Sequence, residues 1–550
     1  MDEYIEYTKI KSFPKLFVDY ITNFNKICEF YSENPFSEKS WEIILNLIKN
    51  RKYKRNIICN ILKKQNKDSE NDLKLLENIN SLENENCFAV MTGQQPGILT
   101  GPLYTIYKAI TAIKLSDFLK RKYNDYNFIP IFWMETNDHD FKEVNKINII
   151  QKDKSLLSLT YKPEKEFENR PVGEITFDEK IGDLLKNFYE LLSDNEFKSE
   201  IINLLTKSFQ ISTSIGTSFR MIMTHLFKGK GLILLDPSDP EFKKLAKDIF
   251  LKISENCEKL NENFSQTYHK LKEHNYQPEV IIKKNSLNLF YHKSGERHPL
   301  YINNDNIILK NNKFMFKKQE LNEIITKSPE LFSPNVLTRP IIQDFIFPTV
   351  SYVAGPTEIC YFSQISDAYK LTEIPMPIIF PRSSTTIIDK KISKIIKSLN
   401  IQPKELIENR NLLEEKLTEK YKSQELINLF QESETTFKIV HQKISSKAET
   451  FDITLKDGVE KSFKKIFYQL NKIEGKFNKI FQEKNSIIKK QTNEINNLIL
   501  PNGKLQERNL NIFTFISKYG MSFIGFLFNE INIYSKKHQL IFLEKISDKQ

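Results

Sequence analysis

A histidine lies between two aspartates at Asp138-His139-Asp140, shortly after an apolar run that ends at Trp133. An imidazole beside carboxylates can have its protonated form stabilised, which suits proton transfer or the binding of developing negative charge. We therefore predict that these three residues are catalytic. The alternative interpretation is a capping cluster on the next helix. Adjacent residues on an extended chain point to opposite sides, so no metal site is predicted here.

A second candidate is the turn in "MTGQQPGILTGPLYTIYKAI", residues 91–110, which follows an apolar run. Its glycines let the backbone approach a phosphate or carboxylate closely, and its two glutamines can both donate and accept hydrogen bonds. The stretch matches neither G-x-x-x-x-G-K-[ST] nor G-x-G-x-x-G. A tight strand-to-helix connection is the alternative interpretation. The candidate nucleotide- or substrate-binding residues here are Thr92, Gly93, Gln94, Gln95, Gly97, Gly101 and Tyr104.

Two later turns also carry candidate binding residues. The first contains Gly355, Pro356 and Glu358, where the glutamate could complement a helix dipole or anchor a substrate amine or a ribose hydroxyl. The second contains Arg382 and Ser383, which suit a phosphate clamp, with a structural turn as the alternative. All five are included among the predicted nucleotide- or substrate-binding residues.

Repeated strand, turn and helix patterns must position these residues. Four apolar runs are each followed by a turn, at 87–91, 128–133, 231–236 and 377–380. This repetition predicts an α/β fold with a Rossmann-like parallel sheet and helices on both faces. The wide spacing of the strands predicts two connective insertions, at about 151–225 and 262–335. Because ligands bind at the carboxyl ends of such strands, the candidate turns are expected to meet at one cavity.

The pattern of residues changes after the core, which we place at 1–385. Between 386 and 500, glycine and proline nearly vanish and apolar residues fall at helical spacing, which predicts a long α-helical coiled-coil segment. The heptad seam runs through Phe463, Ile466, Leu470, Ile473, Phe477 and Ile480. Two helices packed only on each other would explain it, but we favour a seam shared between two chains of a homodimer. Residues 501–550 are predicted to pack back on the core.

Composition limits the class of protein. The 550 residues are 40% hydrophobic and 27% charged, as in ordinary globular proteins. The net charge of +11 is spread along the chain, so no nucleic-acid partner is predicted. An uninterrupted apolar run of about 18 residues is absent, so no membrane association is expected. Five cysteines without a C-x-x-C pair fit a reducing, cytoplasmic location.

These stretches, in this order, resemble the bacillithiol biosynthesis cysteine-adding enzymes, the BshC family. The matching residues are "TGQQPGILTGPLYTIYKAITAIKLS" (92–116), "FWMETNDHDF" (132–141), "GLILLDPSDP" (231–240), "FSPNVLTRPIIQDFIFPTVSYVAGPTEICYFSQ" (332–364), "IPMPIIFPRSS" (374–384) and "LQERNLN" (505–511). The resemblance spans nearly the whole chain. It implies a Rossmann-like core, a coiled coil that dimerises, and a cytosolic enzyme that joins the carboxyl of L-cysteine to the amine of glucosaminyl malate.

A carboxylate is a poor electrophile, so amide formation in water requires an activated acyl group. ATP is the expected co-substrate, and the only metal expected is the Mg²⁺ that accompanies a nucleotide. The core also resembles class I aminoacyl-tRNA synthetases and the mycothiol cysteine ligase, which form cysteinyl adenylate. Their H-x-G-H and K-M-S-K-S motifs are replaced here by residues 93–97 and 382–384.

The predicted roles follow from this chemistry. Residues 93–97 and 355–358 would cradle a nucleotide or a carboxylate with backbone groups. His139, held by Asp138 or Asp140, would stabilise charge on the activated carboxyl or take the amine proton. Arg382 would contact a phosphate or a malate carboxylate. Two rival hypotheses are a non-catalytic ligand-binding scaffold of the pathway and a nucleotidyltransferase-like synthetase relative with another acceptor.

Overall fold

The computed structural model describes residues 4–69, 71–309, 314–398, 401–408, 412 and 424–546. They divide into two compact units. The first contains residues 4–387 together with Lys504–Ile541, and the second contains the described residues of Ile388–Gly503 with residues 542–546. No helix among the described residues is long and apolar enough to cross a membrane. All the predicted site residues belong to the first unit.

A five-stranded parallel sheet forms the centre of the first unit, in the order β13-β12-β2-β3-β6. The strands are β2 Cys87–Gln94, β3 Asn127–Met134, β6 Ile233–Leu235, β12 Thr349–Ala354 and β13 Ile378–Pro381. Almost every strand residue is buried, so both faces of the sheet are covered, as the continuous apolar runs require. The predicted α/β class with a Rossmann-like parallel core is confirmed.

The register of the sheet brings the candidate turns to one edge. Gly93 pairs with Trp133, and Ala354 pairs with Pro381, so β2, β3, β12 and β13 end close to one another. The chain runs from β2 to β3, which lies on one side of β2. Strand β12 lies on the other side of β2. Ligand crevices in open α/β sheets form at such a switch point. The edge between β2 and β12 is therefore where a site is expected.

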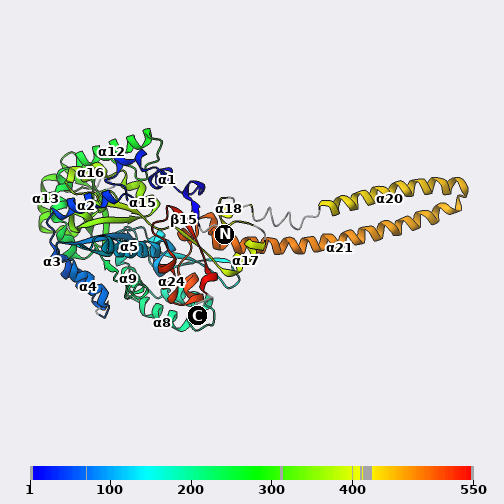
Figure 1. Ribbon diagram of the computed structural model, residues 1–550, viewed down its shortest axis with the longest axis horizontal. Coiled ribbons are helices and arrows are strands. Elements are labelled where there is room, and N and C mark those ends of the chain that lie inside the picture. The colour runs from blue at the N-terminus through cyan, green and yellow to red at the C-terminus, as the bar shows by residue number, and fades with distance from the viewer. Residues whose placement is uncertain are drawn as a thin grey trace. The chain divides into compact units, whose positions relative to one another are not determined.

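Helix α5, Leu103–Lys122, begins directly after the glycine-bearing turn and packs against β2 and β3 (Figure 1). Pro102 precedes it and suits the helix start, because the backbone N–H that proline lacks would have no partner within the helix at this position. The helix is buried on most of its surface, and Lys108 is among its buried residues. A charged group is thus carried into the interior beside the strand ends.

Two inserted segments extend the core. The first contains β4 Lys146–Ile150, β5 Leu156–Thr160, α7 Lys180–Leu191, α8 Lys198–Ser208 and α9 Ile215–Leu226. The second contains α12 Cys257–Glu273 and an antiparallel sheet in the order β10-β9-β8-β7-β11. Its strands are β7 Ser286–Lys293, β8 Glu296–Asn303, β9 Asn306–Ile308, β10 Phe314–Lys317 and β11 Phe332–Pro334. This second sheet contributes side chains to the site described below.

The segment Lys504–Ile541 is held to the core by a buried ion pair. Helix α22, Gln506–Asn509, carries Glu507, whose carboxylate accepts hydrogen bonds from both terminal nitrogens of Arg382 at 3.1 and 2.7 Å. The Ser384 hydroxyl donates to the same carboxylate at 2.8 Å. His538 contacts Ser384 at 2.8 Å, and burial lowers its pKa to about 4. The network is thus one buried charge pair surrounded by neutral donors.

The second unit contains two long helices, α20 Gln424–Phe451 and α21 Thr454–Ile499, which run side by side (Figure 1). Ring contacts between Phe430 and Phe477 and between His441 and Phe463 join them. The predicted coiled-coil segment is therefore a helical hairpin. Phe463 is 8% exposed, but Ile473 remains 48% exposed. Packing between the two helices thus covers only part of the predicted seam, and its sharing with a second chain stays a prediction.

We expect Glu507→Gln to lower the free energy of unfolding by about 3–5 kcal/mol, because Arg382 would keep a buried charge without its carboxylate. Urea unfolding followed by tryptophan fluorescence measures this, since both tryptophans, Trp41 and Trp133, lie in the first unit. The matched control is Glu373→Gln, which breaks an exposed pair with Lys252 and should leave the free energy of unfolding nearly unchanged. Equal losses in the two variants would contradict the role given to Glu507.

Candidate active site

A cavity of about 590 Å³ lies at the carboxyl ends of the central strands. Its size suits a small-molecule ligand. The lining comes from the turns after β2, β3, β12 and β13, from α5, from the second inserted segment and from the segment after residue 504. The polar lining residues are Gln94, Gln95, Tyr104, Lys108, Glu135, Asp138, His139, Glu143, Glu279, Arg297, Asn335, Arg339, Tyr352, Thr357, Glu358, Tyr361, Arg382 and Arg508.

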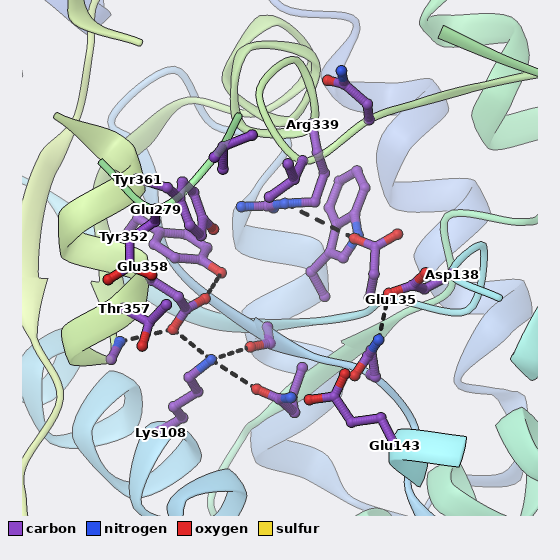
Figure 2. Close-up of a pocket in the computed structure, with 18 of the residues that line it drawn as sticks. Lys108, Glu135, Asp138, Glu143, Glu279, Arg339, Tyr352, Thr357, Glu358 and Tyr361 are labelled. Atoms are coloured by element: carbon purple, nitrogen blue, oxygen red, sulfur yellow. Dashed lines mark hydrogen bonds and ion pairs between the residues drawn. The ribbon is translucent and has the colours of Figure 1, made fainter. Parts of the chain in front are cut away.

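Lys108 joins the two glycine-bearing turns at the floor of this cavity (Figure 2). Its ammonium donates to the Gly93 carbonyl at 2.7 Å and to Gln94 Oε1 at 2.9 Å, and it lies 2.6 Å from Glu358 Oε2. An ammonium has three donors, so these three oxygens satisfy it. Burial lowers the pKa of Lys108, while Glu358 opposes that shift. Lys108 is thus a fully coordinated buried cation.

Glu358 completes the connection from the β12 side. It lies in the first turn of α15, Pro356–Phe362. Its Oε2 also accepts from the Gly355 backbone N–H at 2.7 Å, and its Oε1 accepts from the Tyr352 hydroxyl at 2.9 Å. The carboxylate therefore caps its own helix and balances Lys108. This geometry favours the structural role over direct anchoring of a substrate amine or ribose hydroxyl.

The predicted glycines serve close packing. A Cβ on Gly93 would lie 2.7 Å from the backbone oxygen of Trp133, so β3 leaves no room for a side chain there. A Cβ on Gly97 would lie 3.1 Å from the Cα of Gly101, which itself adopts φ +68°. The Gly355 N–H is taken by Glu358. The Gly355 N–H therefore already has a protein partner, and the backbone cradle of residues 93–97 and 355–358 stays a prediction.

The histidine segment differs in detail from the expectation. Asp138 accepts the His139 backbone N–H at 2.7 Å and a hydrogen bond from the Gln95 side chain. Its carboxylate lies 3.6 Å from His139 Nδ1, beyond hydrogen-bonding distance. That nitrogen instead faces Arg297 Nη1 at 3.3 Å. The ring nitrogen thus contacts an arginine, and the Asp138 carboxylate lies 3.6 Å from both groups.

The structure does not bring every predicted residue to the cavity. Asp140 is the N-cap of α6, Phe141–Val144, and accepts from the Glu143 N–H at 3.3 Å, as the capping alternative states. Thr92 is buried and donates to the Val353 carbonyl at 3.0 Å, which ties β2 to β12. The residues outside the cavity lining are Thr92, Gly97, Gly101, Asp140 and Ser383.

Arg382 lines the cavity, but its charge is already balanced. The paired nitrogens that would clamp a phosphate are bound to Glu507. The side chain is 4% exposed, and the carboxylate outweighs burial in holding its pKa above the usual value. A bidentate phosphate contact, as predicted, would require the Glu507 pair to break. We therefore assign Arg382 a mainly structural role.

A second buried cation, Arg339, faces the opposite wall (Figure 2). It belongs to α14, Arg339–Ile346, and donates to Gln343 at 2.9 Å. Its Nε lies 3.8 Å from Glu135, and its guanidinium stacks near the Tyr352 ring at 5.0 Å. Burial raises the pKa of Glu135, and Arg339 opposes that shift. This charge pair is separate from the pair at Lys108 and from Arg297 and Asp138, which also line the cavity and lie 3.6 Å apart.

Sequence reasoning missed several lining residues. Lys108 and Arg339 gave a weak signal, since each is a cation within a mostly apolar stretch that the family resemblance already covered. Arg297 gave none, because it lies in an inserted strand with no motif.

Arg508 follows Glu507 on α22 and is exposed, with no ion pair within 4 Å among the described residues. Glu143 and Glu279 are carboxylates at the cavity, and burial raises the pKa of both.

Substituting Lys108→Met should lower the free energy of unfolding by about 3–5 kcal/mol, because Glu358 would keep a carboxylate without its cation. Adding Glu358→Gln should recover part of that loss, since the double variant removes both charges. Urea unfolding of the four proteins gives the coupling energy. The exposed pair Lys244–Glu241 is the control, and its two substitutions should show almost no coupling. Additive losses at Lys108 and Glu358 would show that the pair is not coupled.

Comparison with known proteins places the whole chain. Residues 3–383 match "Bacillithiol biosynthesis BshC, N-terminal Rossmann-like domain", and residues 385–543 match "Bacillithiol biosynthesis BshC, C-terminal coiled-coil domain". A protein of Natranaerobius thermophilus is 31% identical over 512 residues, which cover 92% of this chain and 94% of that protein. One of Chlorobaculum tepidum is 30% identical over 558 residues, covering 98% and 99%. Both carry the name "Putative cysteine ligase BshC".

The matched regions cover both units of the structure, and the relatives align along nearly their full length. The expected Rossmann-like core and coiled-coil segment agree with the two family descriptions. The chain therefore belongs to the BshC family of bacillithiol biosynthesis proteins.

Proposed function

We propose that this protein is a cysteine ligase of bacillithiol biosynthesis, which joins the carboxyl of L-cysteine to the amine of glucosaminyl malate in the cytoplasm. The observation that carries the proposal is a single cavity at the strand ends whose lining includes both cations and carboxylates, some of them joined in ion pairs. Both substrates carry an amine and carboxylate groups, so charges of both signs are needed to bind them. The names of the relatives support ligation of cysteine.

The reaction requires activation of the cysteine carboxyl, and we propose ATP, with its Mg²⁺, as the activator. A carboxylate oxygen attacks a phosphorus atom of ATP and forms an acyl adenylate with release of pyrophosphate, or an acyl phosphate with release of ADP. The amine nitrogen of glucosaminyl malate then attacks the acyl carbon. AMP or phosphate leaves, the amide bond forms and the nitrogen loses a proton. Among the described residues, no cluster of His, Cys, Asp or Glu is arranged to hold a metal ion by itself.

His139 is the group proposed to assist this step. It lines the cavity beside Gln95 and Asp138, where it could stabilise charge on the activated carboxyl or take the amine proton. A positioned hydrogen-bond donor of this kind is worth roughly 3–4 kcal/mol in the transition state. The carboxylates of Glu143 and Glu279 are the nearby acidic groups available to an amine.

The direct test is to incubate the full-length protein with L-cysteine, glucosaminyl malate and Mg-ATP and to identify the thiol and nucleotide products by mass spectrometry. We expect the cysteinyl amide together with AMP or ADP. Replacing His139 with alanine should lower kcat roughly 10²–10³-fold without changing the unfolding transition.

The adjacent residue provides a control for this test. Asp140→Asn should leave kcat nearly unchanged, because asparagine caps a helix as well as aspartate does. Absence of any thiol product with every nucleotide would favour a ligand-binding scaffold instead. Full activity of His139→Ala would remove His139 from the mechanism.

We also propose that the coiled coil joins two copies of the chain. Apolar side chains that the helical hairpin leaves largely exposed support this, including Ile466, Ile473, Phe477 and Ile480. Replacing Ile473 and Ile480 together with glutamate should convert a dimer into a monomer, because burying two charges at a seam is unfavourable. Sedimentation equilibrium measures the mass, with Lys472→Glu and Lys479→Glu as control substitutions next to the seam. A monomeric parent protein would refute the proposal.

A further inference from the structure

The hydrogen bond at His139 Nδ1 limits what its imidazole can do. Arg297 Nη1 lies 3.3 Å from Nδ1 in hydrogen-bonding geometry. Asp138 lies farther from this nitrogen, because its Oδ1 is 3.6 Å from both His139 Nδ1 and Arg297 Nη1. Its two oxygens accept from the His139 backbone N–H and from the Gln95 side chain. Nδ1 therefore has a cationic donor as its neighbour.

Arg297 cannot turn away from the ring. It comes from β8 of the second inserted segment, and its Nε donates to Ser333 Oγ at 3.1 Å. Its Nη2 donates to the Pro334 carbonyl at 2.6 Å. The guanidinium also lies 3.7 Å from the centre of the Phe290 ring, and the residue is 5% exposed. These contacts fix the plane of the guanidinium and direct Nη1 towards His139.

The position of the imidazole proton follows from this contact. A guanidinium has five donors and no acceptor, so the nitrogen that it contacts must offer a lone pair. A protonated imidazole has a hydrogen on both nitrogens and would place Nδ1–H against Nη1–H. The neutral ring that accepts at Nδ1 carries its one proton on Nε2. Such a ring can donate at Nε2 but cannot accept a proton there.

We propose that Arg297 is a positioning residue that holds His139 in its neutral Nε2–H tautomer, so that the ring donates a hydrogen bond to negative charge and does not act as the base. The tautomer assignment stands on the contacts alone. The choice between donor and base rests on the proposed ligase function. It selects the first of the two roles considered for His139, and it assigns the amine proton to another group.

The tautomer can be read in the full-length protein by nitrogen NMR with ¹⁵N-labelled histidine. The His139 signals are assigned by their loss in His139→Gln. We expect an unprotonated Nδ1 and a protonated Nε2 in the parent protein. Arg297→Met should move both signals towards the average of a tautomer mixture. Arg339→Met removes another buried cation of the cavity and should leave them in place.

A protonated Nδ1 in the parent protein would overturn the proposal, even if the Arg297 variant fails to fold. No reaction is needed for this measurement, so it stands whether or not the protein ligates cysteine. If the parent protein shows no ligase activity, the proposed function is refuted, but the tautomer is still decided by the NMR measurement.

Turnover then distinguishes a donor from a base. A glutamine amide can donate a hydrogen bond but cannot accept a proton at neutral pH, whereas alanine can do neither. His139→Gln should therefore turn over at least about tenfold faster than His139→Ala. Equal inactivity of these two variants would overturn the donor role.

Discussion

The site depends on one buried cation. Lys108 projects from α5 into the gap between the ends of β2 and β12, and its ammonium binds the Gly93 carbonyl, Gln94 and Glu358 at once. Taking an ammonium out of water is costly, and only a complete set of oxygen partners offsets that cost. The partners come from two turns on different strands, so the lysine fixes the distance between them. The shape of the cavity floor follows from that constraint.

The same logic recurs around the cavity with different partners. Arg339 is set against Glu135, Arg297 contacts His139 near Asp138, and Arg382 is bound by Glu507. Each pair joins parts of the chain that are distant in sequence, including the second inserted segment and the segment after residue 504. Insertions that look like additions to a Rossmann-like sheet therefore supply side chains that line the cavity. The parallel sheet supplies the edge at which they meet, together with Gln94, Trp133 and Tyr352 from its strands.

The sequence contained enough local information to predict the sheet, the turns and part of the cavity lining. Apolar runs followed by glycine-bearing turns are local patterns, and parallel strands bring their carboxyl ends together. The pairings could not be predicted, because Lys108 and Glu358, or Arg382 and Glu507, become neighbours only in the folded chain. His139 shows the consequence. Its sequence neighbours are carboxylates, yet its ring contacts an arginine from a strand of another sheet.

The glycines show why a turn motif alone does not define its ligand. A glycine that lets a phosphate approach and one that lets a neighbouring strand approach look identical in a sequence. Here the Trp133 backbone leaves no room for a side chain at Gly93. The Gly93 carbonyl accepts from Lys108, and the Gly355 N–H donates to Glu358. These two backbone groups therefore have protein partners. Because several cations of the cavity are held in charge pairs, changing one member of a pair also alters the position and charge balance of the other.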